Sequence, residues 1–335
     1  MARGGAPRYL LRVITTLSAR RTIVALALAS MAFSIAGCSS SSSDDGSDSS
    51  SPTDAVSDAT SAAAGTATSA AATTAASATI ASTAAAATTA SKTSSAQIPL
   101  PPVAAQADYQ LGGAYTPPSG VRIVSRDSSA SPVHGIYNIC YINAFQAQPD
   151  ATDWWRANHP DLLLKTASGA PVIDQNWNEQ LLDVSTDAKR AALAQIVGSW
   201  IDGCAAKGFQ AVEPDNLDSY SRSLGLLTAD DDIALATQLA RLAHAKGLAI
   251  GQKNTAEFLP RAHQIGFDFA VTEQCGSYNE CGGYAGTFAN HVVDVVYDDS
   301  GFANACRAYA GKIAIVLRDL DVSPAGGSSY VYKSC

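Results

Sequence analysis

Residues 208–218 read GFQAVEPDNLD: a glycine, an apolar run, and then acids with an amide. Gly208 is placed to end a helix in the left-handed conformation, and the run Phe209–Glu213 is typical of a buried β-strand. The strand leads directly into Asp215 and Asn216. In a parallel α/β barrel, polar residues at the carboxyl ends of strands form the active site. The stretch therefore predicts one barrel strand that delivers acidic groups to such a site.

The same pattern recurs before and after this stretch. Short apolar runs alternate with amphipathic segments, which is the order of parallel strands covered by helices. Eight strands at this length favour a closed (β/α)8 TIM barrel over an open doubly wound sheet. The predicted strands are Tyr109–Gly112, Val121–Ser125, Ile136–Ile142, Phe209–Glu213, Leu248–Gln252, Phe267–Thr272, Val292–Tyr297 and Ile313–Arg318. The predicted helices are Asp187–Lys207, Thr228–Lys246, Thr255–Gln264 and Gly301–Ala310, with Asp187, Thr228 and Thr255 as N-caps and Gly208 and Gly247 at C-termini.

The segment 1–37 has the composition of a secretory signal peptide. Residues 1–21 carry five arginines and no acid, and residues 22–37 are almost wholly apolar or small. The sequence then reads Ile35-Ala36-Gly37-Cys38, which resembles a bacterial lipobox. That resemblance implies cleavage before Cys38, lipidation of its thiol, and a membrane as partner through the lipid. The alternative is an ordinary signal peptide, or an uncleaved anchor, with an incidental cysteine.

Residues 38–106 are predicted to be a disordered, lipid-anchored linker. Ser, Ala and Thr dominate it, and residues 39–100 contain no aromatic side chain. Such a segment cannot bury enough apolar area to offset the entropy lost on ordering. The catalytic domain is therefore expected to occupy residues 107–335, in a protein that is exported and either anchored to the cell surface or secreted.

The charge of the predicted domain restricts its ligands. From residue 107 onward there are 25 acidic and 16 basic residues, a formal charge of −9. This balance argues against nucleic acid and anionic membrane surfaces as partners and suits a neutral or cationic ligand. The five histidines are dispersed, so neither a metal site nor a cofactor is predicted.

Seven cysteines are present, and six remain for the domain if Cys38 is lipidated. An even number in an exported domain indicates up to three disulfides, although the sequence leaves 15 pairings open. A zinc site is the alternative, and the spacing Cys275-x5-Cys281 suits it poorly. We expect Cys275–Cys281 to hold the loop after a catalytic strand and Cys306–Cys335 to hold the C-terminal segment, with Cys140 and Cys204 less defined.

Two carboxylates follow strands that face the same end of the predicted barrel. Asp215 follows the fourth strand and Glu273 the sixth. Paired carboxylates are what glycoside hydrolysis requires, since one donates a proton to the leaving oxygen and the other attacks the sugar. Lys253, on the strand between them, is expected to lower the pKa of the acid that it contacts, for which Asp215 is our choice. Asn216 and Gln274 could bind sugar hydroxyls or orient the acids.

Several of these motifs together resemble glycoside hydrolase family 114. They are Ile139–Ile142, Leu182–Val184, residues 208–218, residues 247–254 (GLAIGQKN) and Glu273-Gln274-Cys275. The family comprises endo-α-1,4-polygalactosaminidases with a TIM-barrel fold. The resemblance implies Asp215 and Glu273 as the catalytic pair and a site wall of Tyr141, Asp183, Asn216, Asp218, Lys253, Asn254 and Tyr297. One departure is Val296-Tyr297, where many members have Glu-Tyr, which places one acidic wall contact in doubt.

The resemblance, with the carboxylate pair, thus implies a retaining endo-glycosidase that cleaves an α-1,4-linked, galactosamine-rich exopolysaccharide. In such an enzyme Asp215 is the nucleophile and Glu273 the acid–base residue, with their carboxyl groups about 5–5.5 Å apart. Two alternatives stay open: a glycosidase for another α-galactosidic or hexosamine glycan, and a lectin-like barrel that binds carbohydrate without cleaving it.

Overall fold

Residues 98–335, described in a computed structural model, form an α/β barrel that is nearly closed. Eight strands are parallel neighbours in one sheet, and a ninth, β12 (Tyr332–Ser334), runs antiparallel to the last of them. The sheet thus confirms the predicted parallel barrel. In order, the parallel strands are β1 (Ala107–Gln110), β2 (Ile123–Asp127), β3 (Tyr137–Asn143), β7 (Ala211–Asp215), β8 (Ala249–Lys253), β9 (Phe269–Glu273), β10 (Val292–Val296) and β11 (Ala314–Arg318).

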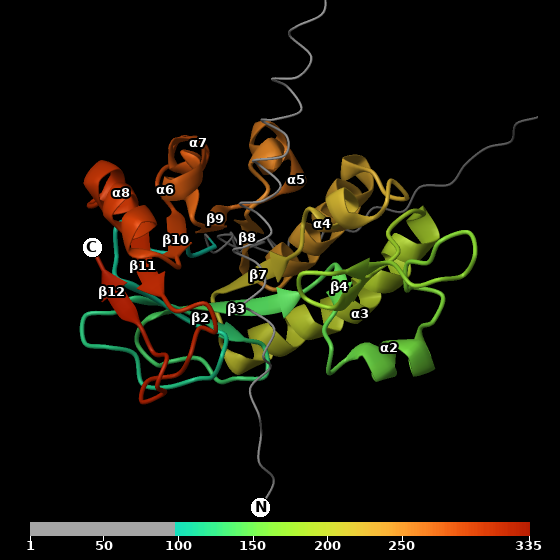
Figure 1. Cartoon of the computed structure of the whole chain (residues 1–335), viewed down its shortest axis with the longest axis horizontal. Coiled ribbons are helices and arrows are strands. Elements are labelled where there is room, and N and C mark those ends of the chain that lie inside the picture. Colours follow the sequence, from blue (N-terminus) through green and yellow to red (C-terminus); the bar gives the residue numbers. More distant parts are fainter. Residues whose placement is uncertain (1–97) are drawn as a thin grey trace, which may run out of the picture. The chain divides into compact units, whose positions relative to one another are not determined.

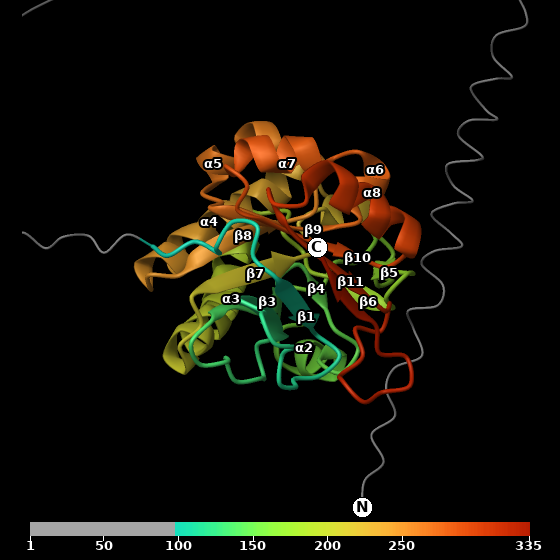
Figure 2. The same cartoon turned by 90° about the vertical axis from the view of Figure 1, so that its left-hand side faces the viewer.

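Helices cover the strands from β7 onward, whereas loops connect β1 to β2 and β2 to β3 (Figures 1 and 2). The helices and 3-10 turns are α2 (Thr152–Asn158), α3 (Asp187–Lys207), η2 (Ser219–Arg222), α4 (Ala229–Ala245), η3 (Ala256–Arg261), α5 (Ala262–Ile265), α6 (Cys275–Tyr278), α7 (Cys281–Thr287) and α8 (Asp299–Tyr309). Between β3 and α3 the chain also forms a small antiparallel sheet of β4 (Gln146–Ala147), β6 (Glu179–Leu181) and β5 (Ile173–Asp174). No helix within residues 98–335 is long and apolar enough to cross a bilayer.

Alternation along the strands divides the core into two layers. Side chains two residues apart point to the same face of a strand, so one set fills the barrel interior and the other packs against the helices. Small and apolar residues fill the lower interior, among them Ala211, Ala249 and Phe269. Residues 98–106 cover this end of the barrel: Ile98 and Leu100 pack against the interior cluster. The apolar base leaves the opposite, carboxyl end for polar groups.

The helix boundaries agree with the sequence in part. The span Asp187–Lys207 is helical as predicted, but its N-cap is Thr186, whose side chain accepts from the Lys189 amide. Thr228 is an N-cap as predicted and forms a capping box with Asp231. The span Thr255–Gln264 is not one α-helix, because Thr255 has φ 61° and caps nothing, and Pro260 lies within a 3-10 turn. Proline lacks the amide hydrogen that a continuous α-helix needs there.

The barrel closes between β11 and β1 through side chains. β12 pairs with the edge of β11 that β10 does not occupy. At the same place Arg318, fully buried, donates to Asp108 Oδ1 of β1 at 3.1 Å. Arg318 also donates to the carbonyls of Val331 (2.9 Å) and Ser323 (2.7 Å). One buried guanidinium therefore joins the first strand, the last parallel strand and the segment that leads into β12.

Three disulfides stabilise the barrel, and they include both predicted pairs. Cys275–Cys281 closes the loop after β9, and Cys306–Cys335 fastens the chain beyond β12 to α8. The remaining pair is Cys140–Cys204, which joins β3 to α3. Together these disulfides are typical of a protein that folds in an oxidising environment. Cys38 lies outside the described residues.

We expect the double variant Cys306→Ser/Cys335→Ser to lose about 3–4 kcal/mol of unfolding free energy, since the loop it opens spans 29 residues. Urea denaturation followed by circular dichroism measures the loss. Cys275→Ser/Cys281→Ser is the comparison: its loop spans only 6 residues, so the chain-entropy effect is about 2 kcal/mol. A larger loss from the shorter loop would contradict this order.

Candidate active site

Polar residues replace apolar ones on the inner face at the carboxyl ends of β7, β8 and β9. On β7 the interior positions run Ala211, Glu213, Asp215, since residues two apart share a face. Lys253 ends β8, and Glu273 ends β9. The three strands are consecutive in the sheet, so these groups meet at one end of the barrel.

Lys253 lies at the centre of this group. Its ammonium nitrogen is 3.2 Å from Asp215 Oδ1, 3.5 Å from Glu273 Oε2 and 3.7 Å from Glu213 Oε1, and the side chain is only 3% exposed. The oxygens of Asp215 and Glu273 that face this one nitrogen are therefore at most about 7 Å apart, within the reach of two-carboxylate hydrolysis. Lys253 holds the predicted pair together.

The carboxylate of Asp215 is held in its ionised form. Oδ1 accepts from Lys253 and from the Asn216 amide at 2.8 Å, and Oδ2 accepts from the Tyr141 hydroxyl at 2.8 Å. Burial raises the pKa of Asp215, but the Lys253 charge and these hydrogen bonds outweigh burial, so the pKa lies below its usual value. This agrees with the predicted role of Lys253 and gives an ionised group suited to attack.

Glu273 is held from the opposite side. Tyr297 donates to Oε1 at 2.5 Å, and Asn254 Nδ2 donates to Oε2 at 2.9 Å. Asn254 also accepts from the Glu273 amide at 2.7 Å, in a left-handed conformation with φ 49° that asparagine tolerates. Burial raises the pKa of both Tyr141 and Tyr297 well above the usual value, so both phenols remain hydrogen-bond donors. Each acid is thus positioned by one tyrosine, and both acids share Lys253.

Glu213 is a third carboxyl in the site and is not among the predicted site residues. It is 0% exposed, accepts from the Tyr109 hydroxyl at 2.7 Å, and its Oε2 has no hydrogen-bond partner. Burial raises its pKa to about 7, although Lys253 and Tyr109 act in the opposite direction. Its position two residues before Asp215 was the available signal, because that spacing places both side chains on the inner face.

A second layer of polar residues surrounds the pair on the β3 side. Asn216 donates to Asn143 Oδ1 at 3.0 Å and accepts from Arg222 at 3.1 Å. Arg222 also forms ion pairs with Asp218 and Asp174, each at 2.8 Å. The predicted wall residues Asn216 and Asp218 therefore lie here, held by an arginine that the sequence analysis did not single out.

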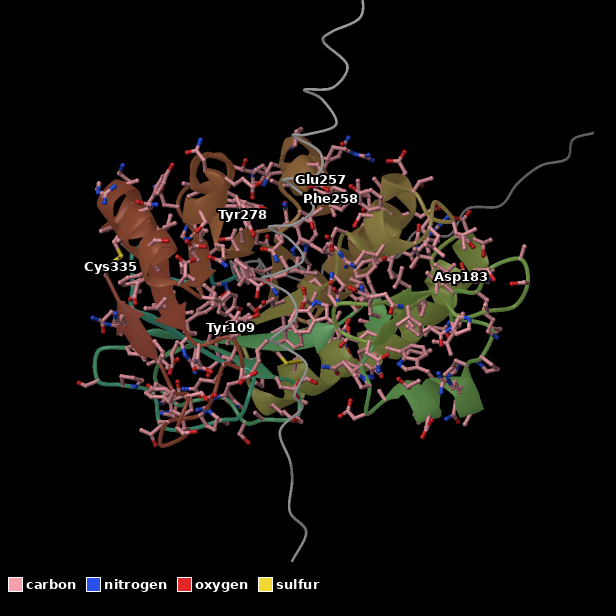
Figure 3. All side chains as sticks on the ribbon, in the orientation of Figure 1. Tyr109, Asp183, Glu257, Phe258, Tyr278 and Cys335 are labelled. Carbon is pink, nitrogen blue, oxygen red and sulfur yellow. A yellow bond between two sulfur atoms is a disulfide. The ribbon has the colours of Figure 1, made fainter. Side chains whose placement is uncertain are left out.

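Asp183 and Gln274, like Asp218, have no hydrogen bond to the pair. Asp183 is bonded to Ser185 and Lys189 at the start of α3, and its label in Figure 3 lies well away from that of Tyr109. Gln274 has φ 61°, and its side-chain oxygen accepts from Ser277 Oγ at 3.3 Å. Neither side chain has a hydrogen bond to Asp215 or Glu273 within residues 98–335.

One cluster in the described part of the chain has metal-ligand residue types: Cys275, Cys281 and Asp294. Its two sulfurs form a disulfide, so they are not available as thiolate ligands. Asp294 instead accepts from Thr272 Oγ1 and from the Cys275 amide, each at 3.0 Å. These residues flank Glu273 and Gln274, and the cluster therefore fixes the turn that follows β9.

The buried carboxyls predict how folding stability depends on pH. Burial raises the pKa of Glu213, Glu179, Asp232 and Asp294 to about 7 each. Their folded-state pKa values exceed the unfolded ones, so their contribution is present at acidic pH and is lost as pH rises through 7. We expect a higher melting temperature at about pH 5.5 than at about pH 8, and a smaller difference in Glu213→Gln. A melting temperature that rises between these pH values would contradict the assignment.

Comparisons with known proteins identify a family. A model of the glycoside-hydrolase family GH114 matches residues 85–335. The crystal structure of Ega3 from Aspergillus fumigatus in complex with galactosamine is similar, with 25% identity and a TM-score of 0.55, covering 71% of this chain and 97% of that chain. The PelA glycoside hydrolase domain from Pseudomonas aeruginosa has 17% identity and a TM-score of 0.47, covering 68% and 99%. No curated protein sequence matches the chain.

Proposed function

The chain belongs to glycoside-hydrolase family GH114 and is a glycoside hydrolase, and from this premise we propose that it is a retaining endo-α-1,4-polygalactosaminidase. The observation that carries the proposal is the position of Lys253, within 3.5 Å of one oxygen each of Asp215 and Glu273. The galactosamine in the Ega3 complex supports the substrate class, since that chain is covered almost entirely. The acidic composition of the domain suits a polymer that carries amines.

In the proposed first step, an oxygen of Asp215 attacks the anomeric carbon while Glu273 donates its proton to the glycosidic oxygen. The bond from carbon 1 to that oxygen breaks, the shortened chain leaves as an alcohol, and a glycosyl ester of Asp215 remains. Glu273, now ionised, then removes a proton from a water molecule that attacks the same carbon. The ester breaks, Asp215 regains its charge, and the two inversions retain the configuration.

The positions of the supporting residues suit these two reaction steps. Lys253 and Tyr141 stabilise the ionised Asp215 before attack and again after the ester is hydrolysed. Tyr297 and Asn254 orient the Glu273 carboxyl toward the leaving oxygen and keep it in place when it changes charge. We therefore propose that Tyr141, Lys253, Asn254 and Tyr297 position the pair, and that Asn216 and Asp218 form the wall beyond.

The test is product analysis on defined oligosaccharides. The panel contains α-1,4-galactosamine oligomers, deacetylated and N-acetylated, together with neutral α-galactosides and β-1,4-glucosamine oligomers. We expect internal cleavage of the galactosamine oligomers by mass spectrometry and an α-anomeric product at early times by NMR. Cleavage of only the neutral α-galactosides would favour the alternative glycan. Binding by wild type without any product would indicate the lectin-like alternative.

We also propose that the protein is exported and anchored through a lipid on Cys38. The lipobox-like residues 35–38 and the disulfides of the domain support this placement. Wild-type protein is expected in the membrane fraction of the native host and in the detergent phase of a Triton X-114 separation. Cys38→Ala should leave both, because the thiol that accepts the lipid is gone. An equal membrane fraction in the variant would contradict lipid anchoring.

A further inference from the structure

Glu179 is a buried acid beside the catalytic pair that makes no ion pair with any residue from 98 to 335. It lies on β6 of the small antiparallel sheet and is 8% exposed. Its Oε2 accepts from Asn143 Nδ2 at 2.8 Å. Gln146 donates to the same oxygen at 2.9 Å when its amide is oriented so that its own oxygen faces Arg222. Both hydrogen bonds reach Oε2, so Oε1 is left for another donor.

Most other acids around the pair already have cations. Asp294, beside Glu273, has none in the described part of the chain, but it lies on the helix-facing side of β10 with Val292 and Val296 and accepts from Thr272 and Cys275. Lys253 forms ion pairs with Glu213, Asp215 and Glu273, and Arg222 forms ion pairs with Asp174 and Asp218. Lys189 serves Asp183. Within residues 98–335, no lysine, arginine or histidine lies within ion-pair distance of Glu179. Burying a carboxylate to nine-tenths without a counter-ion costs desolvation free energy. A bound cation would offset that cost.

Glu179 is also close to the reacting centre. Asn143, which donates to it, is the cross-strand partner of Asp215. The negative charge of Asp215 is one of the causes that raise the pKa of Glu179, after burial. The charges of both Asp215 and Glu179 raise the pKa of Tyr141, which donates to Asp215. In a 2-amino sugar the amine is on the carbon next to the one attacked, so its receptor must lie beside the nucleophile.

We propose that Glu179 is the receptor for the ammonium group on carbon 2 of the sugar at the cleavage site, and that it makes the enzyme prefer deacetylated residues over N-acetylated ones. This inference rests on the proposed function and identifies the carboxylate that binds the charged amine of the substrate. The ammonium would donate to Oε1 and complete the ion pair that the free protein lacks. An acetamide has no charge and is larger, so it gains no ion pair and must displace the carboxyl.

The proposal also predicts a proton change on binding. Burial raises the pKa of Glu179 to about 7, with Asp215 and Asp174 raising it further and Asn143 and Arg222 lowering it. Near pH 6 the free protein therefore holds a proton on Glu179, and a bound cation favours the carboxylate. Galactosamine, protonated at that pH, should release a proton from the protein when it binds.

The first experiment is turnover of matched deacetylated and N-acetylated oligomers by wild type and Glu179→Gln. We expect the ratio of kcat/KM for the deacetylated over the acetylated oligomer to fall about 10- to 100-fold in the variant, the range of a charged hydrogen bond. The matched control is Asp202→Asn, which removes one negative charge from the outer face of α3 and should keep the wild-type ratio. An equal loss on both oligomers, or an unchanged ratio, would overturn the proposal.

The second experiment is independent of turnover. Calorimetry measures the binding of galactosamine, galactose and N-acetylgalactosamine in buffers with different heats of ionisation. Wild type should bind galactosamine most tightly and release a proton, and Glu179→Gln should lose both features while binding galactose as before. If the proposed function is wrong but Glu179 binds the amine, the protein will cleave no galactosamine oligomer and will still bind galactosamine more tightly than galactose. The absence of an amine preference in wild type would refute the role of Glu179.

Discussion

Asp215→Asn is expected to reduce turnover of every glycoside substrate to below about a thousandth of wild type, because its carboxylate bonds to the sugar only along the reaction path. Asparagine keeps the size of the side chain and can still face Lys253, so the fold should persist. No glycosyl-enzyme should form. Intact-mass spectrometry of protein quenched during turnover of a slow, activated substrate measures this directly.

Glu273→Gln provides the contrasting result. Its kcat should fall about 10²–10⁴-fold on natural linkages, which need a proton on the leaving oxygen. The fall should be much smaller on substrates with very acidic leaving groups. A covalent adduct should accumulate in this variant, since deprotonation of the attacking water is slow. The assignment of roles would be reversed if the adduct appeared in Asp215→Asn and not in Glu273→Gln.

Lys253→Met should damage both stability and activity. Methionine retains most of the buried chain but removes the one cation shared by Glu213, Asp215 and Glu273. We expect a loss of about 3–5 kcal/mol of unfolding free energy near pH 7, as is typical when a buried ion pair loses one partner. The loss should shrink at acidic pH, where Glu213, whose pKa is raised to about 7 by burial, takes up a proton.

The activity of the same variant should shift in pH. Lys253 lowers the pKa of Asp215 against the opposing effect of burial, so without it the pKa rises. The acidic limb of the kcat/KM profile is therefore expected to move to higher pH, and the maximum should fall at least about 100-fold. Lys333→Met is the control, because Lys333 is a solvent-exposed lysine paired with Asp299. An unmoved acidic limb would mean that Lys253 does not set the charge of Asp215.

Sequence periodicity was sufficient to locate all eight parallel strands within about two residues. It succeeded because each strand alternates between an interior and a helix-facing layer, and both layers are apolar over most of its length. Asp215 and Glu273 were predictable for a related reason: they occur where an apolar strand ends. Thr255 was misassigned because a threonine before a helical pattern has the composition of an N-cap, while the backbone there is left-handed.

Contacts between segments that are distant in the chain could not be predicted from the sequence. Glu179 lies in the small antiparallel sheet between β3 and α3, whose short strands carry no periodic signal, and only the fold brings it next to Asn143. Asp183 was predicted from its motif, and the sequence did not reveal that its carboxylate is bonded to Lys189 and Ser185. Whether an acid serves the site or a local ion pair depends on which cation is nearby, and that is decided by tertiary structure.

The side-chain closure between β11 and β1 has a consequence for how the protein matures. Asp108 and Arg318, which meet across the closure, are 210 positions apart in the chain, and the β12 strand beside them follows later still. A chain that emerges from its amino end cannot make this closure until Arg318 has appeared. The barrel therefore stays open while its first seven parallel strands are synthesised, and its closure depends on the last of the eight.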